Sequence, residues 1–108
     1  SEEIQRADKV IFPGVGEAST TMNYLRARQL DLLIRDLKQP VLGICLGMQL
    51  MCAHSEENDT PCLGLFDQTV RKFDAAPNRK VPHMGWNDLT GCTDWLPASL
   101  TGKFVYFV

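Results

Sequence analysis

A cysteine between two glycines is the strongest chemical signal in the sequence. Pro40 opens a short apolar run that breaks into Gly43, Cys45 and Gly47 and continues in residues that favour a helix. A strand, a sharp turn and a helix in this order form a nucleophile elbow, here with cysteine in the position of serine. The glycines flank the bend because side chains there would collide with the returning backbone. We therefore expect Cys45 to be exposed at the apex, in a strained backbone conformation.

The predicted surroundings of Cys45 favour its reactive form. The thiol precedes a predicted helix, whose unpaired N–H groups and dipole favour the thiolate. A thiolate attacks a carbonyl carbon, passes through a tetrahedral oxyanion and forms a thioester, which water then cleaves. The sequence thus predicts acyl transfer at Cys45, and the alternative is a buried structural cysteine between two packing glycines.

A glycine-rich segment supplies a donor for that oxyanion. The apolar run 9–12 predicts a buried strand that ends in the loop 13–16, Pro-Gly-Val-Gly. Glycines let a peptide plane in this loop rotate toward a ligand. We expect one backbone N–H of the loop and the N–H of Leu46 to form the oxyanion hole.

Neither histidine of the chain is well spaced to act as the general base. His54 lies nine residues after Cys45, so a continuous helix would carry it roughly 13 Å along the helix axis. His83 lies in a segment interrupted by proline and glycine, where a packing or interface role is the commoner case. The residues therefore predict a nucleophile and an oxyanion hole without an identified base.

The order of the predicted elements indicates an α/β fold. Apolar spacing predicts helix between the loop 13–16 and Pro40, in two pieces that change phase near residues 28–31. The candidate caps of the first piece are Ser19, Thr20 and Thr21. Strand, helix, strand and helix in sequence imply a parallel sheet with crossover helices. The active site of such a sheet lies beyond the carboxyl ends of its strands, where the loop 13–16 and the elbow would meet.

The second half of the sequence is less regular. Residues 55–61 read as a polar surface loop. Residues 63–73 and 104–108 are rich in β-branched, aromatic and aliphatic side chains and predict strands. Between them, the run 80–87 is interrupted by proline and glycine and is expected to be extended and partly exposed.

Composition argues against several functions. The 108 residues carry 11 basic and 13 acidic side chains without a basic block, so we expect no binding to nucleic acid or to a membrane surface. No apolar run approaches the roughly 20 residues that span a bilayer. The four cysteines form no Cys-x-x-Cys pair, which argues against a metal site, and reduced thiols suit a cytoplasmic protein.

The run 43–49, Gly-Ile-Cys-Leu-Gly-Met-Gln, resembles the nucleophile motif of the class I (triad) glutamine amidotransferases. Residues 13–16, 55–57 and above all 81–87 narrow the resemblance to the glutaminase subunits of imidazole glycerol phosphate synthases. The resemblance implies hydrolysis of glutamine to glutamate and ammonia through a γ-glutamyl thioester on Cys45, in histidine biosynthesis and without a cofactor. It also implies a flavodoxin-like parallel sheet with helices on both faces.

The resemblance assigns roles by position in the motifs. It places Val15 and Leu46 in the oxyanion hole and a (β/α)8-barrel cyclase, which receives the ammonia through a tunnel, as the partner. The residues implied to bind the substrate glutamine are Gly14, Gly16, Gln49 and Glu57. Those implied to face the cyclase are His83, Met84, Trp86 and Asn87.

The sequence also departs from the family pattern. The family begins with an earlier strand and helix, and it carries its catalytic histidine and glutamate in a later His-Pro-Glu segment. We therefore expect residues 1–108 to be a fragment of one amidotransferase domain, without its first strand and C-terminal part and inactive alone. The alternatives are a non-catalytic fragment that binds a partner around Trp86, and an unrelated cysteine hydrolase of similar fold.

Overall fold

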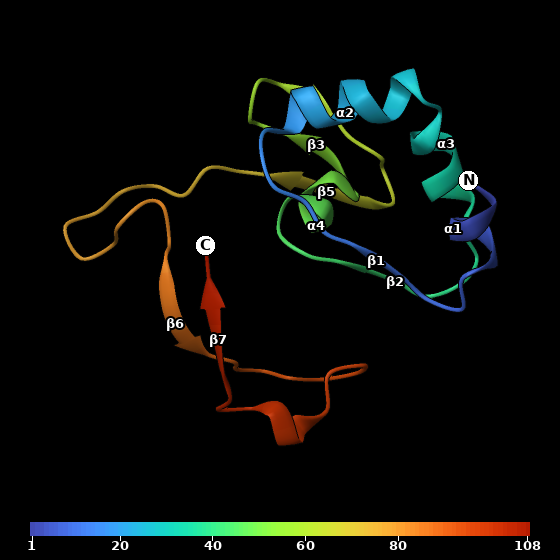
Figure 1. The fold of residues 1–108 in the computed structure, drawn as a ribbon. Helices are drawn as coiled ribbons and strands as arrows, with labels where there is room; N and C mark the ends of the chain where they lie inside the picture. Colours follow the sequence, from blue (N-terminus) through green and yellow to red (C-terminus); the bar gives the residue numbers. More distant parts are fainter. The chain divides into compact units, whose positions relative to one another are not determined.

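A computed structural model describes residues 1–108, which fold as two units, Ser1–Lys72 and Phe73–Val108 (Figure 1). The elements of the first unit are α1 (Glu2–Arg6), β1 (Val10–Phe12), α2 (Ala18–Ala27), α3 (Leu30–Asp36), β2 (Val41–Gly43), α4 (Leu46–Leu50), β3 (Cys52–Ser55), β4 (Thr60–Pro61) and β5 (Phe66–Val70). Those of the second are β6 (Gly85–Asp88), a 3₁₀ turn (Ala98–Leu100) and β7 (Phe104–Phe107). No helix has the length and apolar character needed to cross a membrane.

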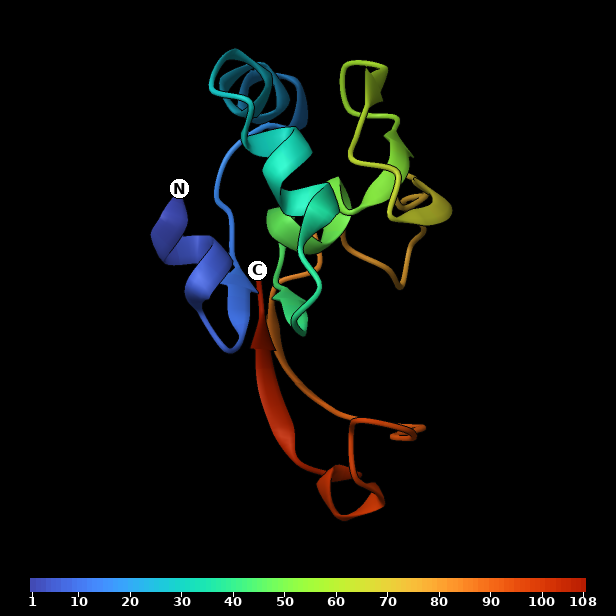
Figure 2. The same cartoon turned by 90° about the vertical axis from the view of Figure 1, so that its right-hand side faces the viewer.

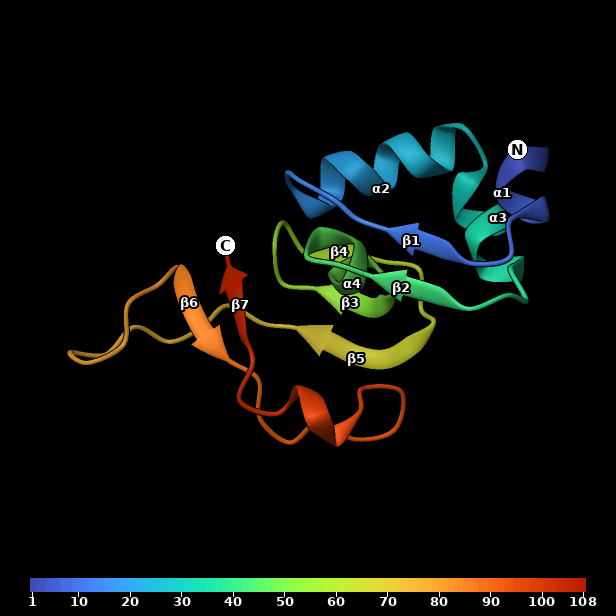
Figure 3. The ribbon, with the colours of Figure 1, turned by 60° about the horizontal axis from the view of Figure 1, so that its bottom comes forward.

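Strands β1 and β2 confirm the predicted parallel pair. Val10 lies opposite Val41 and Phe12 opposite Gly43, and Figure 3 shows both arrows pointing the same way. The chain crosses from one strand to the other through α2 and α3. Because the strands are parallel, the loop after β1 and the elbow after β2 leave the same edge of the sheet.

The helical crossover has the predicted break. Gln29 adopts a left-handed conformation, with φ of 56°, between α2 and α3. Figure 2 views α2 nearly end-on and α3 obliquely, so the two helix axes differ. The predicted caps of α2 are wrong, because the N-cap is Glu17 and its carboxylate accepts from the N–H groups of Ser19 and Thr20.

The helix after the elbow is shorter than a continuous helix to His54 would require. It ends at Leu50, and Cys52 and His54 lie on β3. The carbonyl of Leu50 accepts from the N–H of Leu63, and that of Met51 from the N–H groups of Leu65 and Phe66. These bonds to a distant segment replace the ones that a longer helix would make.

A three-stranded sheet follows, in the order β4-β3-β5. β3 pairs antiparallel with β4 and parallel with β5, and its register with β5 shifts between Cys52 and His54. The strand predicted over 63–73 is confined to Phe66–Val70. The sheet leaves residues 56–59 as the connection between β3 and β4.

The core of the first unit lies between α2, α4 and the segment after β4. Met22 and Leu50 are fully buried, and each stabilises the fold by about 1.5–3 kcal/mol relative to an exposed position. Phe12, at the end of β1, packs against this cluster. The core thus holds the end of β1 and the helix after the elbow together. The buried cluster consists of Ala18, Met22, Leu25, Leu46, Leu50, Cys62 and Leu63.

The second unit is built on an antiparallel pair, β6 and β7. Trp86 lies opposite Tyr106, and their rings meet edge to face at 5.3 Å between centroids. β7 confirms the strand predicted over 104–108, and β6 falls at the end of the run predicted to be extended. Both strands are largely exposed within the structure.

Candidate active site

Cys45 occupies the apex of the predicted elbow. β2 ends at Gly43 and α4 begins at Leu46, so only two residues connect strand and helix. Cys45 has φ of 55° and ψ of −124°, a conformation that non-glycine residues rarely adopt, and it is exposed. The predicted strain and exposure are therefore both confirmed. Helix α4 has only five residues, which limits the dipole near the thiol.

The elbow glycines are required by close backbone contacts. A Cβ atom on Gly47 would collide with the carbonyl oxygen of Phe12 and lie 3.0 Å from that of Pro13. A Cβ atom on Gly43 would lie 2.8 Å from the Cα of Met48. Glycine is therefore needed on both sides of Cys45, because α4 packs directly on β2 and on the end of β1.

The loop 13–16 lies against the first turn of α4. A Cβ atom on Gly14 would lie 2.9 Å from the Cβ of Leu46 and 3.0 Å from the amide nitrogen of Gly47. Gly16 has φ of 117°, and the side chain of Val15 is 98% exposed. The structure thus brings the loop 13–16 and the first turn of α4 into contact. The approach is so close that there is no room for a side chain at Gly14.

The loop between β3 and β4 is more ordered than a solvated turn. Ser55 and Thr60, at its two ends, are buried. The N–H of Glu57 donates to the Ser55 hydroxyl at 3.2 Å, and the Thr60 hydroxyl donates to the carbonyl of Glu57 at 2.8 Å. Two buried hydroxyl groups therefore fix the backbone on both sides of Glu57.

Glu57 and Glu17 both cap helix α2. Oε1 of Glu57 accepts from the N–H of Ala18 at 2.7 Å. The carboxylate of Glu17 accepts from the Ser19 hydroxyl, from the N–H groups of Ser19 and Thr20, and from the Thr20 hydroxyl. The bonds from the Ser19 side chain and backbone, followed by those from Thr20, hold the pKa of Glu17 well below its usual range.

Comparison with known proteins identifies the family of this chain. The family described as "Glutamine amidotransferase class-I" matches residues 1–101. The chain belongs to the class-I glutamine amidotransferases. This membership overturns the alternative of an unrelated cysteine hydrolase.

Several curated relatives of the amidotransferase chain are subunits of imidazole glycerol phosphate synthases. It is 58% identical over 109 residues to "Imidazole glycerol phosphate synthase subunit HisH" of Bacteroides thetaiotaomicron, an alignment of 99% of this chain and 56% of the relative. It is 49% identical over 110 residues to "Imidazole glycerol phosphate synthase subunit HisH 2" of Legionella pneumophila, with 100% and 55% covered. The "Imidazole glycerol phosphate synthase subunit HisH" of Idiomarina loihiensis is 44% identical over 108 residues, again with 100% of this chain and 55% of the relative covered. The chain therefore spans about half the length of the curated relatives it matches.

The histidines of the amidotransferase chain have partners of their own. Nε2 of His54 lies 2.7 Å from Oδ1 of Asp59. In the second unit, Nε2 of His83 lies 2.9 Å from Nδ2 of Asn87, and its ring packs edge to face on Phe107. Gln49 lies within α4, half-buried, one position before the core residue Leu50. No group of three His, Cys, Asp or Glu side chains gathers as metal ligands would.

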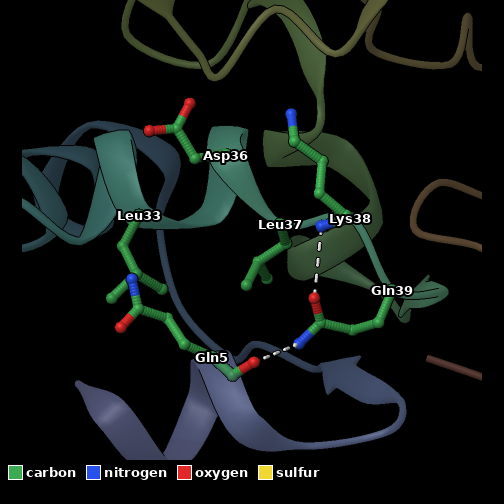
Figure 4. A pocket seen from close by; sticks show the side chains of 6 residues that line it. All are labelled: Gln5, Leu33, Asp36, Leu37, Lys38 and Gln39. Atoms are coloured by element: carbon green, nitrogen blue, oxygen red, sulfur yellow. Dashed lines mark hydrogen bonds between the residues drawn. The ribbon is translucent and has the colours of Figure 1, made fainter.

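A cavity of about 200 Å³ lies beside the segment that leads into β2, at the opposite end of the β1–β2 pair from the elbow (Figure 4). The side-chain amide of Gln39 donates to the carbonyls of Ile4 and Ala7 and accepts from the N–H of Lys38. Because these bonds occupy its amide, Gln39 ties α1 to the segment before β2. The cavity is thus a structural feature separate from the elbow. Its lining consists of Gln5, Leu33, Asp36, Leu37, Lys38 and Gln39.

Sequence reasoning named Glu57 as a site residue but missed its bond to the start of α2 and missed Glu17 and Asn58 beside it. Glu17 directly follows the loop 13–16, and Glu57 and Asn58 approach it from the loop between β3 and β4. Sequence spacing carries no signal of a contact across about forty positions. The only hint is local, since Asn58 and Asp59 are residue types that tolerate the left-handed conformation, and both adopt it.

Proposed function

We propose that this chain is part of the glutaminase subunit of an imidazole glycerol phosphate synthase, which hydrolyses glutamine to glutamate and ammonia in histidine biosynthesis. The observation that carries the proposal is the exposed, strained Cys45 at an elbow against which a glycine loop packs. The names of relatives at 44–58% identity support the choice of this synthase.

The reaction follows from the chemistry of the thiolate. The sulfur of Cys45 attacks the side-chain amide carbon of glutamine, and a tetrahedral oxyanion forms. Collapse of this intermediate breaks the C–N bond, and the nitrogen takes up the proton that the thiol lost and leaves as ammonia. Water then breaks the C–S bond of the thioester, which gives glutamate and restores the thiol. We assign the base to neither His54 nor His83. The resemblance to the family places it in a His-Pro-Glu segment beyond residue 108.

The oxyanion would be bound by the backbone N–H groups of Val15 and Leu46. The contact of Gly14 with the first turn of α4 supports this pairing, because it puts the two segments side by side. Gly14 and Gly16 flank Val15, and glycines on both sides allow its peptide planes to turn toward the substrate. Two such donors typically account for much of the rate enhancement in acyl transfer.

Gln49 and Glu57 would hold the substrate glutamine. Oε1 of Glu57 is committed to the N–H of Ala18, which leaves Oε2 to accept from the α-ammonium group of glutamine. Gln49 lies on α4, about one helical turn after the N-cap residue Cys45. Gln49 therefore lies on the helix that follows the elbow, and Glu57 lies on a loop bonded to the start of α2, directly after the glycine loop.

The second unit would supply the surface for the cyclase, a (β/α)8 barrel. Trp86 is 67% exposed and Met84 63% exposed, and large side chains of these types are common interface anchors. His83 and Asn87, in the same unit, are joined by a hydrogen bond. We further propose that residues 1–108 are part of one flavodoxin-like amidotransferase domain in a cytoplasmic enzyme.

Glutaminase activity of the complete protein with its cyclase tests the proposal. Cys45→Ser should abolish the release of glutamate and ammonia, because the hydroxyl is far less nucleophilic than a thiolate at neutral pH. Cys52→Ser is the matched control, since Cys52 is also a free cysteine but lies on β3. Full activity in Cys45→Ser, or equal loss in both variants, would contradict the assignment.

A further inference from the structure

Two loops meet at the first turn of α2. Asn58 donates from Nδ2 to Oε1 of Glu17 at 2.7 Å, and the N–H of Ala18 donates to Oε1 of Glu57 at 2.7 Å. Glu17 and Ala18 directly follow the glycine loop, whereas Glu57 and Asn58 form the tip of the loop between β3 and β4. Two neighbouring residues of the β3–β4 loop are thus bonded to the N-cap and the first residue of α2.

Glu17 is suited to anchor the bond from Asn58. Its Oε1 also accepts from the N–H of Ser19, and its Oε2 accepts from the Ser19 hydroxyl and from the N–H and hydroxyl of Thr20. These donors fix both oxygens of the carboxylate, so Asn58 bonds to a group that is already immobile. The same bonds, first those from Ser19, hold the pKa of Glu17 well below its usual range, so the carboxylate stays ionised even in mildly acidic solution.

The Glu17–Asn58 bond is one of two bonds that hold the loop around Glu57 to the start of α2. Hydroxyl groups of Ser55 and Thr60 fix the loop at its ends, and Asp59 of the tip bonds to His54. The bonds that join the tip to the start of α2 are those of Glu57 and Asn58. If Asn58 were released, the tip would be held to α2 by a single side chain. That side chain is the carboxylate that we assign to the glutamine α-ammonium group.

We propose that Glu17 is a positioning residue, which through Asn58 holds the carboxylate of Glu57 in place for the α-ammonium group of glutamine. The inference rests on the proposed function and deepens it. On this inference, the Glu17–Asn58 bond strengthens the binding of glutamine through its α-ammonium group. The amide that reacts at Cys45 lies at the other end of glutamine.

An exchange of partners tests this role in the complete protein with its cyclase. Asn58→Asp places one carboxylate against another, and Glu17→Gln removes an acceptor charge, so each should raise KM for glutamine by about three- to tenfold with a smaller effect on kcat. The double variant E17Q/N58D reverses donor and acceptor, and it should return KM to within about twofold of the wild type. Asp59→Asn is the matched control, because it changes the charge of the same loop at a residue that contacts His54 and leaves the Glu17–Asn58 bond intact.

Glutaramate, which is glutamine without its α-amino group, separates positioning from a general structural effect. Asn58→Asp should leave KM for glutaramate unchanged, because that substrate has no ammonium group for Glu57. Equal increases for both substrates, an unchanged KM for glutamine, or no rescue in the double variant would overturn the inference while the wild type remains active. A wild-type protein without Cys45-dependent glutamine hydrolysis would overturn the proposed function, and the inference with it.

Discussion

Gly47→Ala tests the close approach on which the elbow is built. The added Cβ would collide with the carbonyl oxygen of Phe12 and lie 2.6 Å from its carbonyl carbon. Both partners are backbone atoms, so the clash is relieved only if α4 moves away from the end of β1. Such a movement also opens the core between Phe12 and Leu46.

Overpacking of this kind costs about 1–3 kcal/mol in the free energy of unfolding. In a protein as long as the curated relatives, a loss of about 2 kcal/mol lowers Tm by about 4–8 °C. Thermal unfolding followed by circular dichroism measures the shift. Met48→Ala is the control, because Met48 lies on the same helix but is exposed, and surface changes usually stay within about 0.5 kcal/mol. If Gly47→Ala melted together with Met48→Ala, the close contact between α4 and β1 would be refuted.

Three further predictions concern the oxyanion loop, the cap and the second unit. Val15→Pro removes one proposed oxyanion donor and should lower glutaminase turnover by about 10²–10³, and unchanged turnover would exclude the Val15 N–H. Because the pKa of Glu17 is lowered on folding, the stabilisation from its cap is present above the unfolded pKa of about 4.3 and is lost as the pH falls through the folded pKa. Wild-type stability should therefore fall more steeply than that of Glu17→Gln on acidification below that pH, and parallel curves in acid denaturation would count against this. Trp86→Ala should weaken association with the cyclase at least tenfold in titration calorimetry, by about 1.4 kcal/mol or more, and unchanged affinity would remove Trp86 from the interface.

The elbow and the glycine loop were predictable because backbone constraints there are local. Glycine and proline mark where the chain must turn or approach itself, so residues 13–16 and 43–47 identify both turns without reference to distant residues. The phase change before α3 likewise located the break at Gln29. These features depend on φ preferences and apolar spacing, which the sequence displays directly.

The caps and the end of α4 were not predictable for the opposite reason. Glutamate is not a preferred N-cap residue, and Glu17 acts as one only because its side chain folds back to Ser19 and Thr20. The end of α4 depends on residues 63–66, whose N–H groups take the last carbonyls. The cap depends on a side-chain conformation that residue preferences do not reveal, and the end of α4 depends on a contact with a later segment that spacing within one helix does not reveal.

The central claim is that Cys45 is the nucleophile that forms a γ-glutamyl thioester. A glutamine analogue with an electrophilic carbon in place of the side-chain amide traps such a nucleophile, and mass spectrometry of the digested protein locates the adduct. We predict one adduct, on the peptide that contains Cys45, and protection by excess glutamine. An adduct on Cys52 or Cys92, or labelling of Cys45 that glutamine does not slow, would contradict the account.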